Sequence, residues 1–463
     1  MTKRLLLAAA AAIVLPFGAL PLSASAQTMD AALLRDAALR DDTLAWDITE
    51  GLTTEIGPRL AGTEDEARAR DWAVKRLTAL GFRNVRIEPF MMPVWVRGEE
   101  TAEVVSPFPQ KLRLTALGNS GATPAAGLTG EIVYFPTLAD LQAAPDGSLK
   151  GKIAFVSHAM AATQDGSSYG YYGAVRRSGP AVAARKGAAA IVIRSVGTDY
   201  HRNPHAGGTN FPDGVKAIPA AALSIPDAEQ LERILKRGSP VKLKIVLTPR
   251  QTGMKQSGNV IAEVPGSDPA AGIVLIGGHL DSWDLGTGAI DDASGVAITT
   301  AAAKRIMDAG TPRRTIRVVW FGAEEVGVFG GRAYGEAHGS DNHVAAAESD
   351  FGADRIWRFE TNLPDGAKAV GDRLATALFP LGIAKGPDKA GDGADVGPIM
   401  AKGVAAIDLN QSGLDYFNLH HTPDDTLDKI DPAKLRQNVA AWTAMLAIVA
   451  NAPEDIGKVA PKR

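Results

Sequence analysis

Apolar residues after position 258 follow two alternating periods. Short runs that are almost entirely apolar are typical of strands buried on both faces. Longer stretches with an apolar residue every three or four positions are typical of helices that cover a sheet. The predicted strands cover 273–277, 315–321, 344–350 and 404–408, and the predicted helices cover 292–309 and a final segment starting at Pro432. This alternation predicts an α/β fold with helices on both faces of a sheet.

The part of the chain before residue 251 differs in composition and pattern from the part that follows. Residues 27–117 open with helical patterns, among them a predicted capping box formed by Thr63 and Glu66. From about residue 118 to 250, Gly, Pro and Ser become frequent and apolar runs become short. We therefore expect one domain in two parts, 27–117 and 251–463, with a second domain inserted at 118–250.

The first 26 residues read as a targeting segment. Lys3 and Arg4 precede an apolar run at 5–15, and Ala24-Ser25-Ala26 has the small-residue pattern of a cleavage site. A membrane anchor is the alternative, but the run is shorter than the roughly 20 residues that a spanning helix needs. The pattern predicts a signal peptide at 1–26 and an exported protein, periplasmic or secreted, with no membrane association after cleavage.

Composition narrows the range of functions. The 463 residues carry a formal net charge of −3, which argues against a nucleic-acid binder that works by net positive charge. The chain contains no Cys, which excludes disulfides, thiolate metal ligands and a catalytic thiol.

Candidate side chains gather where predicted strands end. A single one of these segments fits a capped helix or a polar turn equally well. In parallel sheets, however, strand ends meet at one edge, where ligands bind. The segments are His279 with Asp281, Asp291 with Asp292, Glu324 with Glu325, Glu348 with Asp350, and His420 with His421. Together they predict a site for a pair of metal ions, with zinc as the favoured occupant.

These five segments, in this order, resemble peptidase family M28, whose members carry two co-catalytic zinc ions. Further stretches share the resemblance at 56–62, 93–95, 204–207 and 279–284. It covers the chain after the signal peptide and implies a zinc-exopeptidase-type mixed sheet flanked by helices. It also implies that the insert is a protease-associated (PA-like) domain.

The resemblance assigns a role to each candidate residue. One zinc ion would be held by His279, Asp291 and Asp350, and the other by Asp291, Glu325 and His421. Asp291 would thus bridge the two ions. Asp281 would orient His279, and Glu324 would act as general base. Two such ions would offset the charge of the four carboxylates, as a buried site requires.

One position departs from the family pattern. Many M28 aminopeptidases carry Tyr just before the last His ligand, where this chain has His420. Tyr416 is close in sequence but not at the matching position. His420 is therefore a candidate hydrogen-bond donor to the reacting carbonyl, and a purely structural role beside the metal cluster is the alternative.

Other polar residues leave two readings open. Asp392 and Asp395 lie in a Gly-rich loop that would either rim the pocket or form a solvated turn. His201 and His205 lie on the insert, either as part of a lid or on a surface loop. We expect the remaining histidines, His158, His338 and His343, to be structural.

The resemblance implies an exopeptidase that hydrolyses dipeptides or short peptides with a free amino terminus. Glu324 and Asp350 are the candidates for binding the substrate amine, and the insert is expected to narrow access. The metal core does not separate aminopeptidase, dipeptidase and carboxypeptidase action. A glutaminyl-cyclase-like acyltransferase with one zinc ion and a non-catalytic receptor-like protein are the alternatives. The resemblance also suggests a homodimer.

Overall fold

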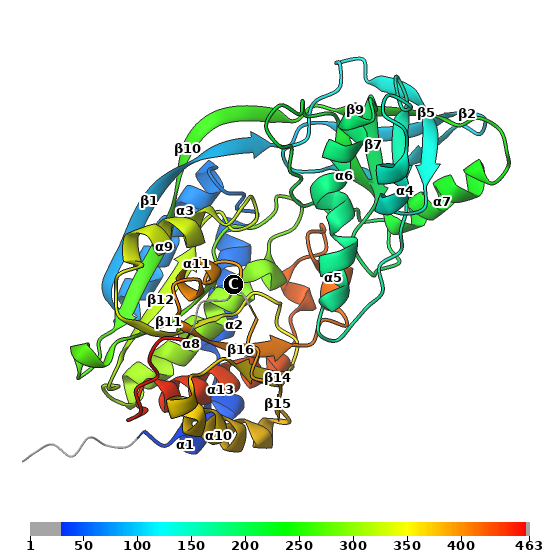
Figure 1. Cartoon of the computed structure of the whole chain (residues 1–463). Coiled ribbons are helices and arrows are strands. Elements are labelled where there is room, and N and C mark those ends of the chain that lie inside the picture. Colours follow the sequence, from blue (N-terminus) through cyan, green and yellow to red (C-terminus); the bar gives the residue numbers. More distant parts are fainter. Residues whose placement is uncertain (1–28, 392, 460–463) are drawn as a thin grey trace, which may run out of the picture.

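The computed structural model describes residues 29–391 and 393–459. The predicted signal peptide at 1–26 and the predicted rim residue Asp392 lie outside the described residues. Among the described residues, no helix combines the length and the apolar character needed to cross a membrane. The described chain forms two eight-stranded sheets, joined by two long antiparallel strands (Figure 1).

The first sheet contains the predicted parallel strands. Their order is β1-β10-β12-β11-β13-β16-β14-β15, with β11 parallel to both β12 and β13. The bounds are β1 Arg83–Val96, β10 Arg250–Val264, β11 Ile273–His279, β12 Thr315–Phe321, β13 His343–Glu348, β14 Ile356–Thr361, β15 Ala384–Lys385 and β16 Ala405–Gln411. Antiparallel pairs, β1 with β10 and β14 with β16, make the sheet mixed, as expected.

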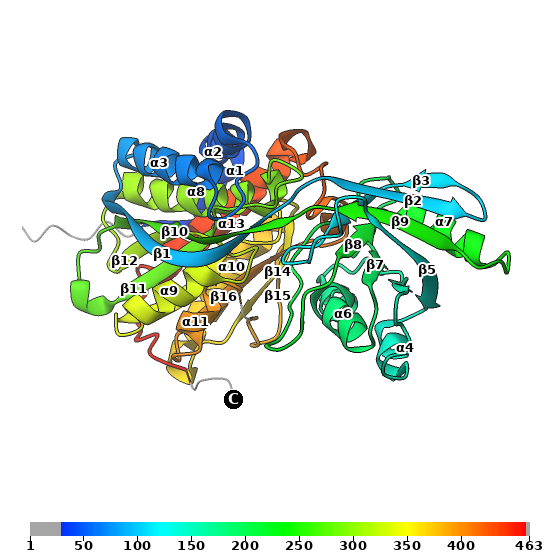
Figure 2. The ribbon, with the colours of Figure 1, turned by 90° about the horizontal axis from the view of Figure 1, so that it is seen from above.

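Helices cover both faces of this sheet, as Figure 2 shows. Val274 and Ile276 of β11 belong to the apolar cluster that contains α8 and α13, whereas Leu275 packs with α9 and α11 on the other side. This alternation follows from the period of two along a strand. The helices are α1 Ala31–Asp41, α2 Leu44–Gly51, α3 Glu64–Ala79, α8 Ser294–Ala309, α9 Phe329–His338, α10 Lys368–Leu378, α11 Gly397–Met400, α12 Tyr416–Leu419 and α13 Pro432–Val449.

The second sheet is built between β1 and β10. Its order is β3-β2-β9-β5-β6-β7-β8-β4, and β5 to β8 run parallel. The strands are β2 Glu100–Ser106, β3 Gln110–Leu112, β4 Leu114–Ala116, β5 Leu128–Phe135, β6 Ile153–Val156, β7 Ala190–Arg194, β8 Ala220–Leu223 and β9 Lys242–Leu247. The helices are α4 Leu138–Ala143, α5 Ser167–Tyr172, α6 Ala174–Arg185 and α7 Ile225–Leu235.

The second sheet begins earlier than the boundary expected at residue 118. Three of its strands, β2, β3 and β4, precede that residue. The change to Gly- and Pro-rich texture marks loops, whereas β2 has the ordinary alternation of exposed and buried residues that any half-buried strand shows. The change in composition therefore lies further along the chain than the start of the second sheet.

The two sheets meet at the loops that carry the candidate site. The main-chain N–H of Thr198 donates to the carbonyl of Phe417 at 3.1 Å, and that of Ala206 donates to His421 at 2.9 Å. In Figure 1, α5 and α6 lie close to the orange segment that includes α12. Residues from the second sheet's surroundings therefore form part of the wall around the candidate site.

Candidate metal centre

The carboxyl ends of three neighbouring parallel strands position the candidate ligands. His279 is the last residue of β11, Glu324 and Glu325 follow β12, and Asp350 follows β13. Asp291 lies in the segment Ala289–Ala293 that leads into α8, and its own backbone is not helical. His420 and His421 follow α12 from the other side of the site. This edge is where open α/β sheets bind ligands.

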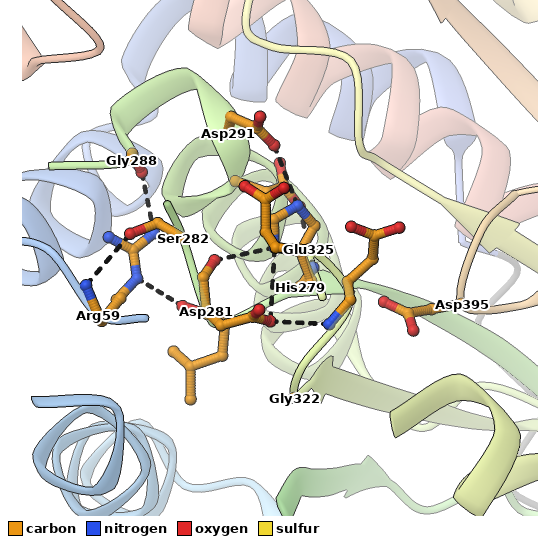
Figure 3. Close-up of polar contacts among 12 residues, drawn as sticks. Arg59, His279, Asp281, Ser282, Gly288, Asp291, Gly322, Glu325 and Asp395 are labelled. Carbon is orange, nitrogen blue, oxygen red and sulfur yellow. Dashed lines mark hydrogen bonds and ion pairs between the residues drawn. The ribbon is translucent and has the colours of Figure 1, made fainter. Parts of the chain in front are cut away.

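The five predicted ligands converge around Asp291. His279 Nε2 lies 3.0 Å from Asp291 Oδ1 and 3.3 Å from Asp350 Oδ1. His421 Nε2 lies 3.2 Å from Asp291 Oδ2 and 2.9 Å from Glu325 Oε2. Asp291 thus faces one histidine with each carboxylate oxygen, and Figure 3 shows it close to His279 and Glu325. This geometry suits a carboxylate that bridges two cations.

Two oxygens in this cluster lack a well-aligned donor. Asp291 Oδ2 and Glu325 Oε1 are buried and accept no hydrogen bond of good geometry from the described residues, although His421 Nε2 lies 3.2 Å from Asp291 Oδ2. Buried carboxylate oxygens are costly unless they are hydrogen-bonded or coordinate a metal. Donor atoms of His279, Asp291 and Glu325, and likewise of Asp291, His420 and His421, lie within 4.8 Å of one another. The residues present therefore fit zinc, which favours His and carboxylate ligands.

The adjacent Asp292 has a structural role. Its Oδ2 accepts the main-chain N–H of His279 at 3.0 Å, and its Oδ1 accepts that of Gly295 at 3.0 Å. Both oxygens are thereby engaged, at the end of β11 and in the first turn of α8. Asp292 fastens these two elements together and so fixes His279 beside Asp291.

The electrostatics of the cluster show an excess of acidic groups. Burial raises the pKa of Glu324 well above its usual value, and Asp350, Asp395 and Glu325 raise it further. Burial and Asp291 raise the pKa of Glu325 to about 6. Burial alone would lower the pKa of His421, but Glu325 and Asp291 raise it to about 10. Bound dications would stabilise this cluster, because their positive charge offsets the repulsion between the carboxylates.

Asp281 supports the site differently from the expected role. His279 Nδ1 lies 2.9 Å from the main-chain carbonyl oxygen of Asp281, whereas the Asp281 carboxylate is 3.8 Å away. That carboxylate instead accepts the main-chain N–H of Glu324 at 3.0 Å. The main chain of Asp281 therefore orients His279, and its side chain holds the backbone of Glu324.

His420 is packed in an aromatic cage next to the cluster. Its ring stacks on that of His421 and meets Tyr169, Tyr416 and Phe417. Burial and the neighbouring His421 lower the pKa of His420 well below its usual value, so its imidazole is neutral. Its Nε2 lies 3.6 Å from Asp291 Oδ2. A neutral imidazole has one N–H to donate, as the proposed contact with a carbonyl requires.

A cavity of about 380 Å³ opens beside these residues. Asp291, Glu324, Glu325 and Asp350 contribute one part of its wall, and His420 and His421 another. Its remaining lining includes Arg176, Arg177 and Asn210 from the surroundings of the second sheet. The volume is within the usual range for small-molecule sites.

Two buried arginines that were not predicted from the sequence also shape the site. Arg59 is fully buried and donates to the carbonyls of Thr287 at 2.6 Å and Gly288 at 2.9 Å, next to the segment that carries Asp291 (Figure 3). Arg176 reaches across from α6 and lies 3.3 Å from His421 Nδ1. Arg59 lay within the family-like stretch at 56–62, but no local signal marked Arg176.

The structure also places four other polar residues that the sequence singled out. His205 is buried, with its Nδ1 2.7 Å from the carbonyl oxygen of His420 and its Nε2 beside Asp199. His201 is partly exposed and also contacts Asp199. Asp395 is fully buried and accepts the N–H of Gly331 at 3.1 Å, so the solvated-turn reading is wrong for it. His343 is buried and bonded to Tyr334, which fits a structural role.

Known proteins resemble this chain in sequence and in fold. The model of peptidase family M28 matches residues 259–446. Carboxypeptidase Q of Bos taurus is 33% identical over 407 residues, 87% of this chain and 84% of the relative. The crystal structure of a peptidase M28 precursor from Shewanella amazonensis SB2B has 49% identity and a TM-score of 0.90, over 93% of this chain and 98% of that one.

A more distant structure shares the fold. A zinc aminopeptidase from Bacillus subtilis superposes with a TM-score of 0.63 at 20% identity, over 90% of this chain and 98% of that one. At this identity the similarity concerns the fold, a mixed α/β architecture. These comparisons agree with the mixed α/β sheet flanked by helices that was predicted from the sequence.

Proposed function

This chain belongs to peptidase family M28 and is a metallopeptidase. We propose that it is an exported exopeptidase that uses two zinc ions. Its substrates would be dipeptides or short peptides with a free amino terminus. One observation carries the proposal: Asp291 directs one carboxylate oxygen at His279, which also contacts Asp350, and the other at His421, which also contacts Glu325. That arrangement offers two adjacent ligand sets that share one residue.

His279, Asp291 and Asp350 would hold one zinc ion, and Asp291, Glu325 and His421 the other. Two ions held there would lower the pKa of a bound water to near neutrality and polarise the scissile carbonyl. Glu324 would take a proton from the attacking water and return it to the leaving amine. Its raised pKa and its place in the cavity wall support this role. Its main-chain N–H is held by Asp281, which fixes the backbone from which the carboxylate projects.

The substrate's ends would be recognised by charge. Glu324 and Asp350 both line the cavity and are the candidates for binding the free amine. His420 would donate its N–H to the carbonyl oxygen as negative charge develops there. We also propose that the domain built around the second sheet is a protease-associated domain. Its helix α6 contributes to the cavity wall. The proposed export is based on the predicted signal peptide. The family resemblance is the basis for proposing a homodimer.

The experiment compares an unblocked dipeptide with its N-acetylated twin, using the purified mature chain with zinc supplied. We expect hydrolysis of the free dipeptide only, together with two zinc ions per chain by elemental analysis. One zinc ion per chain with cyclisation of an N-terminal glutamine would instead favour the glutaminyl-cyclase-like alternative. Full occupancy without turnover of any peptide would contradict the proposal and favour a binding protein.

A further inference from the structure

A loop of the domain built around the second sheet, here called the second domain, is bonded to the segment that carries the predicted zinc ligand His421. The loop covers residues 195–207 and follows β7. Its main-chain N–H groups at Thr198 and Ala206 donate to the carbonyls of Phe417 and His421, at 3.1 and 2.9 Å. The backbone of the ligand segment is therefore held from outside its own domain.

His205 is the central side chain of this contact. Its ring is buried, and its Nδ1 lies 2.7 Å from the carbonyl oxygen of His420. A carbonyl oxygen can only accept, so Nδ1 donates the hydrogen, while Nε2 shares a hydrogen with the buried carboxylate of Asp199. A Cβ atom at Gly197 would lie 2.3 Å from the same ring, so the glycine leaves the room that the ring needs. The imidazole is thus enclosed and fixed in direction.

The backbone of His421 needs such support. Its φ of 62° lies in the left-handed region, which residues with a side chain rarely adopt. The carbonyls on either side of this φ accept from His205 and Ala206. The ring Nδ1 of His421 also lies 3.3 Å from the carbonyl oxygen of Ala206, to which Arg176 donates as well. A hydrogen bond from the second ring nitrogen fixes the direction of a metal-binding imidazole.

The other predicted ligands are supported differently. His279 ends a strand of the first sheet, and Glu325 and Asp350 follow two more of its strands. His421 instead depends on contacts that cross between the domains. Zinc binding at His421 and the docking of the loop 195–207 therefore favour each other, and by linkage each strengthens the other by the same factor.

We propose that the Asp199–His205 pair, with the main chain of Ala206, positions His421 as a zinc ligand. This inference rests on the proposed two-zinc function and adds that the second domain completes the metal centre, besides forming part of the cavity wall. His205 is a positioning residue, since it acts through the backbone of His420 and His421.

The test compares substitutions at two buried histidines. His205→Phe keeps a ring of similar size and removes the donor to the His420 carbonyl. His343→Phe is the matched control, because His343 is also buried and bonded to Tyr334 but begins β13 at the end away from Asp350. We expect His205→Phe to weaken the binding of one zinc ion about 10- to 100-fold, measured by competition with a chromophoric chelator, and His343→Phe to change neither site.

Two further readouts separate positioning from stability. His205→Asn, whose amide can still donate to the His420 carbonyl, should recover part of the zinc affinity. With cobalt in place of zinc, the visible spectrum of His205→Phe should differ from that of the wild type, because the spectrum depends on ligand geometry. A role in stability alone would lower the Tm of His205→Phe and leave its metal affinity and cobalt spectrum unchanged, which would contradict the inference.

The wild type alone supplies a measurement that remains valid if His205→Phe does not fold. Zinc should slow hydrogen exchange at the amides of the loop 195–207 but not in β2, which lies near the other edge of the second sheet. Equal effects of His205→Phe and His343→Phe on zinc affinity, or loop exchange that zinc does not alter, would overturn the inference and leave the two-zinc function intact. A wild type that takes up fewer than two zinc ions would instead contradict the proposed function, and the inference with it.

Discussion

The rings of His420 and His421 stack with their centres 3.5 Å apart and their planes at 24°. His421 points its Nε2 at Glu325 and Asp291, as a metal ligand would. His420 lies alongside with its Nδ1 buried and unpartnered among the described residues. Both Nε2 atoms approach Asp291 Oδ2, at 3.6 Å for His420 and 3.2 Å for His421, but only His421 also contacts Glu325.

Replacing His420 with Phe should lower kcat and leave the zinc content unchanged. Phe can keep the aromatic packing against Tyr416 and Phe417 but has no N–H to donate. Loss of one donor to a developing oxyanion typically costs about 10²-fold in kcat. Steady-state kinetics on a free dipeptide, together with elemental analysis of zinc, would measure both quantities.

Tyr416→Phe is the matched control, because Tyr416 lines the same cavity and contacts the same ring. If His420→Phe keeps full turnover while Tyr416→Phe loses it, the tyrosine is the donor and His420 is structural. Zinc loss in His420→Phe would instead show that His420 supports the ligand His421.

Glu324 and Glu325 are adjacent but should respond differently to the same substitution. Glu324→Gln is expected to retain both zinc ions and lose about 10²- to 10⁴-fold in kcat, because a general base is removed. Glu325→Gln should lose zinc, since Glu325 Oε2 lies 2.9 Å from His421 Nε2 in one ligand set. Zinc content and kcat measured on both variants test the assignment, and zinc loss from Glu324→Gln would reverse it.

The contact between Asp281 and the backbone of Glu324 gives a graded prediction. In Asp281→Asn the side-chain carbonyl can still accept the N–H of Glu324, so kcat should fall little. In Asp281→Ala that acceptor is lost, and kcat should fall by at least tenfold as Glu324 shifts, consistent with about 1–3 kcal/mol for an unsatisfied buried N–H. Zinc affinity should change little in both variants, because His279 is oriented by the main-chain carbonyl. Large zinc loss in Asp281→Asn would restore the carboxylate's expected role as the partner of His279.

Removing metal should destabilise the protein at neutral pH. Asp291, Asp350, Glu324 and Glu325 lie close together in a buried cluster, and their repulsion is offset when dications bind. At free zinc 100-fold above Kd, binding adds about 2.7 kcal/mol to the unfolding free energy. The Tm of chelator-treated protein should therefore fall and recover on adding zinc. An unchanged Tm after metal loss verified by elemental analysis would contradict the expected coupling.

Much of the site could be predicted because strand ends and motifs are local. His279, Asp291 and Glu325 each follow or precede a recognisable apolar run, and parallel strands bring such ends together. The Arg176 contact was not predictable, since it joins positions 245 residues apart and depends on how the second sheet packs. The same holds for His205, whose partner His420 lies in another part of the chain.

Local motifs predicted where a helix begins better than they predicted which partner a side chain contacts. Thr63 caps α3 as expected, by accepting the N–H of Glu66. Glu66 does not complete the predicted capping box, because its carboxylate pairs with Arg70 and accepts from Ser257 of β10. An ion pair one helical turn along α3 and a hydrogen bond from β10 to the helix thus replaced the expected bond to Thr63. A tertiary partner such as Ser257 leaves no periodic trace in a sequence.

The buried His343 should make stability depend on mildly acidic pH. Burial, with Arg317 nearby, lowers its pKa to about 4, and its Nε2 lies 2.8 Å from the hydroxyl of Tyr334. Below the unfolded value of about 6.5 the unfolded chain binds this proton while the folded protein does not, so stability falls as pH falls. Between pH 7 and 5 this one group should remove about 2 kcal/mol of unfolding free energy.

His343→Gln tests this prediction, since glutamine can accept from Tyr334 without titrating. Urea unfolding of both metal-free proteins at pH 7 and pH 5 would cancel the contributions that they share, including those of the acidic cluster. We expect the wild type to lose about 2 kcal/mol more than the variant over this interval. Equal losses would mean that His343 is protonated in the folded state at pH 5, and that the Tyr334 hydroxyl then accepts from its Nε2 instead of donating.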